Sequence, residues 1–199
     1  MAYPTVTAPY GFKPINRFDG IPYAGATMLM PVTSGQAVFN GQVVKQVAGG
    51  TISPIADLTA ESLYAVGVCT GVQYTNAQGQ TVQAQYAPAS GVTNVLAYVV
   101  VDPNANFKVA VTNSGGTITP VAATVVGSNM LGVTGTGNTT SGDITSSVYG
   151  GSAGVTDTHL FRVIAVVPET ANASGYTEVI VKFNGTWHQM LSTTGTALA

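Results

Sequence analysis

The turn from Asp102 to Asn106 contains the residue types that come closest to a chemical site. Asp102, Asn104 and Asn106 place side-chain oxygens at alternate positions, as in the first half of a calcium-binding loop. Such a loop continues with a glycine and ends with a bidentate glutamate, but this chain has Phe107 and Asn113 at those positions. Because Asp and Asn are also ordinary turn residues, the sequence favours an Asx-rich turn over a calcium site.

The chain has two histidines, His159 and His188, and one cysteine, Cys69. A zinc site takes three or four ligands, usually at short spacings, and a cysteine or serine nucleophile needs a histidine base. Neither pattern is marked, since only Asp157 lies close to His159. The Gly-x-Ser-x-Gly match at residues 150–154 lies in a Gly/Ser-rich loop and is not a nucleophile elbow. Cys69 lies in an apolar run, which indicates a buried structural thiol. We therefore expect no catalytic residues, no metal and no cofactor.

Charged residues make up only 7% of the 199-residue chain, against about 25% in an ordinary soluble protein. A membrane helix needs about 18 consecutive apolar residues, far more than the longest run, Val95 to Val101. Disorder needs low hydrophobicity with a high net charge, and the net charge here is only -2. The composition therefore favours a β-rich protein whose surface is largely covered by neighbours in a stable assembly.

The 6 lysines and arginines are scattered along the chain, whereas nucleic-acid binding needs several cations on one surface. We therefore expect no nucleic-acid partner and no membrane partner. The N-terminus lacks a basic segment followed by an apolar one, so no secretory signal is expected and synthesis in a cytoplasm follows.

Residues 1–22 contain 4 of the 10 prolines and show no helical or strand period. Proline fixes its own backbone and extends the residue before it, so this stretch is expected to form an extended arm. Its aromatic residues, Tyr3, Tyr10 and Phe12, are poor choices for a solvated tail. Such an arm lies in a groove either on its own body or on a partner, and the sequence leaves both open.

Residues 23–199 are expected to form a β-rich body of short strands and turns. Val95 to Val101 is apolar on both faces and Phe107 to Thr112 on one, so we expect a covered central strand paired with a more peripheral one. Two further hairpins are expected, across Gly49-Gly50 and across residues 76–80.

The other expected elements are short. Asp57 to Leu63 is the best helical turn, with Asp57 as its cap. Residues 113–157 are expected to be Gly/Thr/Ser-rich loops around short strands at 121–126, 130–133 and 144–149. Strands follow at 160–167 and 178–183. The fold class is all-β: a small barrel or sandwich of short antiparallel strands with an extended N-terminal arm.

Several short motifs occur in an order and spacing that resemble head decoration, or cement, proteins of tailed bacteriophages. They are the opening MAYPTV with APYGFKPIN, GQVVK at 41–45, the turn from Val101 to Val109, VVPET at 166–170 and EVIVKFN at 178–184. The resemblance covers most of the chain and is weakest in residues 113–157.

This resemblance implies a structural virion protein that binds the outer surface of a phage head. It would act as a homotrimer, stabilise contacts between major capsid subunits and have no enzymatic activity. The N-terminal arm would supply the capsid contacts, through Tyr3, Pro4, Tyr10, Phe12, Lys13, Pro14 and Arg17.

Two alternatives stay open at this point. One is a head fibre, tail or receptor-binding virion protein that recognises a host glycan, with Trp187 and the tyrosines stacking on sugar. The other is a soluble enzyme whose catalytic groups converge only in the fold.

Overall fold

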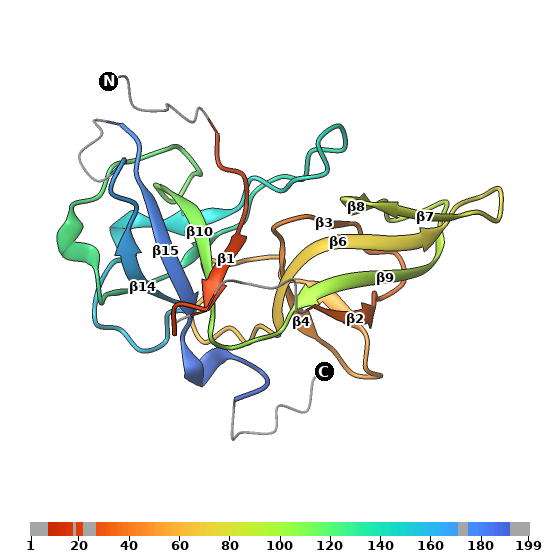
Figure 1. The fold of residues 1–199 in the computed structure, drawn as a ribbon, viewed down its shortest axis with the longest axis horizontal. Coiled ribbons are helices and arrows are strands. Elements are labelled where there is room, and N and C mark those ends of the chain that lie inside the picture. The colour runs from red at the N-terminus through yellow and green to blue at the C-terminus, as the bar shows by residue number, and fades with distance from the viewer. Residues whose placement is uncertain (1–7, 18, 22–26, 171–174, 192–199) are drawn as a thin grey trace.

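A computed structural model of the chain describes residues 8–17, 19–21, 27–170 and 175–191 and shows an all-β protein, as expected (Figure 1). The helices in these residues are three single 3-10 turns, η1 (Ala123–Val125), η2 (Gly150–Ser152) and η3 (Gly185–Trp187). No helix in the described part of the chain has the length and apolar character needed to cross a membrane.

The lobe on the left of Figure 1 is a seven-stranded sheet that is nearly closed into a barrel. Its main path runs through β11 (Asn129–Met130), β14 (Phe161–Val166), β15 (Glu178–Phe183), β10 (Ala105–Thr112), β13 (Ser147–Tyr149) and β12 (Gly132–Val133). Only Leu131 separates β11 from β12, so the two ends of the path meet there, and the backbone N–H of Tyr149 donates to the Leu131 carbonyl at 2.9 Å.

The seventh strand of this sheet, β1 (Lys13–Arg17), comes from the expected N-terminal arm. It pairs antiparallel with the first half of β10, and β13 pairs with the last two residues of the same strand. β15 pairs with one edge of β10. β1 and β13 therefore follow one another along the other edge of β10. β1 is therefore part of the barrel wall (Figure 1).

The other lobe is built on a six-stranded sheet. Its path is β2 (Met28–Pro31), β9 (Thr93–Val100), β6 (Gly67–Thr75), β4 (Val43–Gln46) and β5 (Ile52–Pro54), with β7 (Thr81–Ala84) added to β6. A separate pair, β3 (Val38–Phe39) and β8 (Tyr86–Ala87), lies beside it. Just after β2, Val32 forms a bridge to Ile52, which brings the two ends of this sheet together as well.

Two clusters of buried apolar side chains fill the molecule. The smaller one belongs to the six-stranded lobe and contains Cys69 and Val99. The larger one fills the barrel but also includes Val43, Val68 and Val100, which come from strands of the six-stranded sheet. The larger cluster therefore takes side chains from both lobes.

Several expected elements are confirmed. The hairpin across Gly49-Gly50 is β4–β5, and the hairpin across residues 76–80 is β6–β7. The strands expected at 160–167 and 178–183 are β14 and β15, which pair with each other. Local turn residues and alternating apolar residues determine these elements, so neighbouring sequence is enough to predict them.

The expected hairpin between Val95–Val101 and Phe107–Thr112 is wrong. β9 and β10 belong to different sheets, and the turn between them carries the chain from one lobe to the other. The roles of the strands are also reversed, because β10 is buried at every position except Lys108, whereas the first half of β9 is largely exposed or half-buried. β10 is the central strand, with neighbours on both edges.

Two smaller expectations are also wrong. Asp57 to Leu63 forms bends rather than a helical turn, and the Asp57 carboxylate accepts hydrogen bonds from the backbone N–H and the hydroxyl of Thr59, at 2.8 and 2.6 Å. Such a local Asx contact offers the backbone an alternative to a helix. The strand expected at 121–126 is instead the 3-10 turn η1.

Candidate functional site at the N-terminal segment

The N-terminal segment, defined here as residues 8–17, contains the described part of the expected capsid-contact site. Phe12 is fully buried in the larger core, where its ring stacks on Phe161 with centroids 4.6 Å apart. The sequence left open whether the arm lies on its own body or on a partner. Residues 8–17 lie on their own body. Phe12 was expected at the capsid contact, and in this structure its buried ring presents no surface to a partner.

Tyr10 is held by a charged group on β15. Its hydroxyl donates a hydrogen bond to Glu178, whose carboxylate also lies 3.4 Å from the Lys108 ammonium. The same ammonium lies 5.6 Å from the centre of the Tyr10 ring. Burial and the Glu178 carboxylate raise the pKa of both Tyr10 and the neighbouring Tyr176. Both hydroxyls therefore remain protonated at neutral pH and can donate.

Lys13 is held by the loop that precedes β13. Its ammonium lies 2.5 Å from the Asp143 carboxylate, 130 positions away in the sequence. Bridges from Asp143 to Asn40 and from Ile144 to Gly137 position this loop. Gly135 is required at its base, because a Cβ there would lie 2.1 Å from the backbone of Thr145.

The end of β1 is held by the turn between β9 and β10. The Arg17 guanidinium lies 3.2 Å from the Asp102 carboxylate and 3.5 Å from Asp19. Beside it, the Asn106 side-chain amide donates to the Asn16 side-chain oxygen at 3.0 Å. Asp102 also accepts from the backbone N–H of Asn104 at 2.8 Å, so the Asx-rich turn predicted from the sequence is present.

The structure therefore brings Tyr10, Lys13 and Arg17 each to a carboxylate from a different part of the chain. Pro14 lies opposite Phe107 in the pairing of β1 with β10, while Tyr3 and Pro4 lie outside the described residues. The sequence did not reveal Glu178, Asp143 and Lys108 as partners, because only the fold makes them neighbours. The arrangement positions a strand.

The residues considered for catalysis, Cys69, His159 and His188, are buried. The Cys69 thiol donates to the Gly71 carbonyl at 3.4 Å, and burial raises its pKa to about 12. In His188, Nδ1 accepts from the backbone N–H of Met190 at 3.2 Å, and burial lowers the pKa to about 4. Among the described residues, no group of three or more His, Cys, Asp or Glu side chains is arranged to hold a metal ion.

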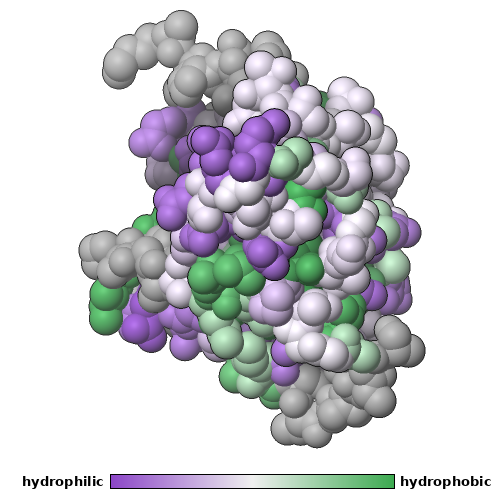
Figure 2. All heavy atoms as spheres, turned by 90° about the vertical axis from the view of Figure 1, so that its right-hand side faces the viewer, coloured by the Kyte–Doolittle hydropathy of each residue, from purple (hydrophilic) through white to green (hydrophobic). Residues whose placement is uncertain are grey.

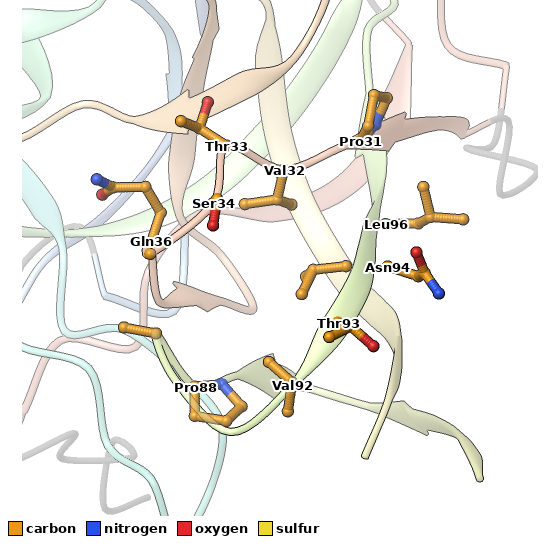
Figure 3. Close-up of a pocket in the computed structure, with 13 residues that line it drawn as sticks. Pro31, Val32, Thr33, Ser34, Gln36, Pro88, Val92, Thr93, Asn94 and Leu96 are labelled. Atoms are coloured by element: carbon orange, nitrogen blue, oxygen red, sulfur yellow. The ribbon is translucent and has the colours of Figure 1, made fainter. Parts of the chain in front are cut away.

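A hollow of about 560 Å³ lies at one end of the six-stranded lobe. Figure 3 shows Ser34 and Gln36 on one side of it and Pro88 and Val92 on the other. None of its 13 lining residues is charged. On this side of the molecule, Figure 2 shows apolar surface surrounded by neutral and hydrophilic residues. Met28 and Leu29, on the outermost strand β2 of the six-stranded sheet, are 49% and 44% exposed.

The fold and site together define an all-β protein with a nearly closed barrel and an N-terminal strand fastened by carboxylates. Comparisons with protein families, with curated proteins and with solved structures gave no match to this chain.

Proposed function

We propose that this chain is a structural virion protein that binds the outer surface of a phage head and stabilises contacts between major capsid subunits. In this proposal it is made in the host cytoplasm, assembles as a homotrimer and has no enzymatic activity. The observation that supports the proposal best is its charge-poor β surface, with an uncharged hollow and exposed Met28 and Leu29. Such a surface suits a protein that neighbours cover on several sides.

The physical role is that of a clamp. A protein that binds only the assembled shell adds its binding free energy to the stability of that shell. Because many copies bind one symmetric particle, a modest binding free energy per copy adds up over the whole shell. The nearly closed barrel and the N-terminal segment paired with it support this role, because a preorganised body loses little conformational entropy on docking.

Docking is tested with expanded phage heads that lack this protein. Removing residues 2–7 deletes Tyr3 and Pro4 but keeps Phe12 and β1, so the variant is expected to fold and to bind heads weakly. A deletion through residue 17 would be uninformative, because it removes Phe12 from the core. Normal head binding by the 2–7 deletion would exclude a capsid contact through Tyr3 and Pro4.

The body surface is tested with Leu29→Lys, which places a charge on exposed β2. The matched control, Thr81→Lys, places the same charge on exposed β7. Leu29→Lys is expected to reduce trimer formation, head binding or both, measured by light scattering and by co-sedimentation, while the control keeps both. If wild-type protein neither forms trimers nor binds heads, the proposed function is wrong.

The alternative function, recognition of a host glycan by a fibre or tail protein, has less support from the described residues. The Trp187 indole N–H donates to the Asp157 carbonyl at 2.5 Å, and its ring packs edge-on against Tyr64 at 5.1 Å. The Trp187 side chain is therefore engaged in contacts within its own chain. The number of copies per particle separates the two functions, because a decoration protein occupies every equivalent lattice position and a fibre or tail protein only a few.

A further inference from the structure

Val155 projects from the barrel lobe into solvent. Its side chain is 99% exposed, whereas Ile21, the next most exposed large apolar residue among those the structure describes, is 53% exposed. Val155 lies in a bend within residues 153–157, which we call the Val155 loop. A side chain exposed to this degree makes almost no contact with its own chain, so its apolar surface is available to another molecule.

The Val155 loop is held in place by Asn129 of β11, which is itself buried. The Asn129 backbone exchanges two hydrogen bonds with Gly154, at 2.7 and 3.1 Å, and its side-chain amide donates to the Thr156 carbonyl at 3.0 Å. The residues on either side of Val155 are therefore fixed to the same asparagine. A side chain presented in this way loses little conformational entropy when it docks.

The hollow on the six-stranded lobe is a concave surface that suits such a group. Its volume of about 560 Å³ falls within the range of about 300–1,000 Å³ that is typical of binding sites. Val32, Val92 and Val95 are among its apolar lining residues, and the backbone N–H of Val32 donates to the Val95 carbonyl at 2.9 Å. Because no lining residue is charged, an apolar group can enter without removing water from a charge.

The chemistry of the hollow selects an occupant that is convex and uncharged. The tip Gly154-Val155-Thr156 meets both conditions, because it projects from a loop and the first charged residue after it is Asp157. The exposed side chains of Met28 and Leu29 belong to strand β2 and cover a sheet rather than project from a loop. The same chain therefore carries both a concave surface and a group that fits it.

We propose that the Val155 loop of one copy of this chain docks into the hollow of a second copy. The two surfaces belong to different lobes, so each copy offers its loop to one neighbour and its hollow to another. Such a head-to-tail contact closes into a ring when the rotation between neighbours allows it. Val155 is the buried anchor, and the contacts around it exclude water. The inference rests on the self-association included in the proposed function and names the residues that make it.

The first experiment measures self-association of the whole chain by analytical ultracentrifugation over a range of protein concentrations. Val155→Asp places a charge in the uncharged hollow, and the matched control Val126→Asp makes the same change at a barrel-lobe residue that is 48% exposed. Burying a valine side chain corresponds to a factor of about 10–100 in an association constant. We expect Val155→Asp to weaken self-association at least about tenfold and the control to leave it unchanged. Equal association of Val155→Asp and wild type would overturn the proposal.

Mixing two variants tests the head-to-tail arrangement. Thr93→Lys places a positive charge at an exposed lining position of the hollow and should also weaken self-association. In a mixture, the Val155→Asp copy offers an unchanged hollow to the unchanged loop of the Thr93→Lys copy, and the two introduced charges attract each other at the next contact. The mixture should therefore associate at least about tenfold more tightly than either variant alone. A mixture no tighter than its components would overturn the proposal.

Head binding separates this inference from the proposed function. Wild-type protein that stays monomeric in the ultracentrifuge yet binds expanded heads would overturn the Val155 contact and leave the head-binding role standing. Self-association that depends on Val155 and Thr93, without any head binding, would support the contact and count against that role.

Discussion

Phe12 is the residue that joins the N-terminal segment to the core, since its ring is fully buried against Phe161. Truncating a buried phenylalanine removes apolar contacts and leaves a cavity, which costs about 3–5 kcal/mol. We expect Phe12→Ala to lower the free energy of unfolding by that amount in urea denaturation. Tyr10→Phe, which removes only the hydroxyl that donates to Glu178, should cost about 1 kcal/mol. Equal effects of the two changes would contradict this ranking.

His188 makes stability depend on pH in a predictable direction. Burial lowers its pKa from 6.5 to about 4, so the folded state binds a proton less readily than the unfolded state. Stability is therefore highest above pH 6.5 and falls as the pH drops toward 4. Between pH 7 and pH 5 the loss should be about 2 kcal/mol, from the shift converted to free energy. His188→Gln should reduce this loss, measured by urea denaturation at the two pH values.

At the scale of elements, β6 offers a matched pair of glycines. A Cβ at Gly67 would lie 2.1 Å from the Val100 carbonyl oxygen, whereas the nearest atom to a Cβ at Gly71 is 3.5 Å away. Gly67 therefore allows β6 and β9 to approach closely. We expect Gly67→Ala to destabilise the protein by several kcal/mol, as overpacking against backbone does, and Gly71→Ala to have an effect of about 1 kcal/mol or less. Thermal denaturation of both variants measures the difference.

The elements also show what the sequence could predict. Hairpins β4–β5 and β6–β7 were predictable because Gly49-Gly50 and residues 76–80 close them locally. The separation of β9 from β10 was not, because Asp102 and Asn104 form the same Asx turn whether the next strand folds back or enters another sheet. The partners of the N-terminal segment were also hidden, since Lys13 and Asp143 are 130 positions apart.

At the scale of the whole molecule, the larger cluster, to which both lobes contribute, predicts that the lobes unfold together. Cys69 is buried in the core of the six-stranded lobe, and Trp187 packs against the larger core. Since Val43, Val68 and Val100 connect the two lobes, neither should persist alone. Equilibrium unfolding in urea, followed by Trp187 fluorescence and by thiol labelling of Cys69, should give one midpoint. Two separate midpoints would show that the lobes are independent.

The central position of β10 has a consequence for synthesis on the ribosome. The strands of the six-stranded lobe lie between residues 28 and 100, so that lobe can form from a continuous stretch of nascent chain. β10 follows directly, but its partner β15 begins at Glu178. At about 5–20 residues per second, β15 is made roughly 3–13 s after β10. Until β13 is made, at about half of that interval, β10 has only β1 available as a neighbour among the described strands. The N-terminal segment is thus in a position to shield the nascent barrel strand until β13 and β15 arrive.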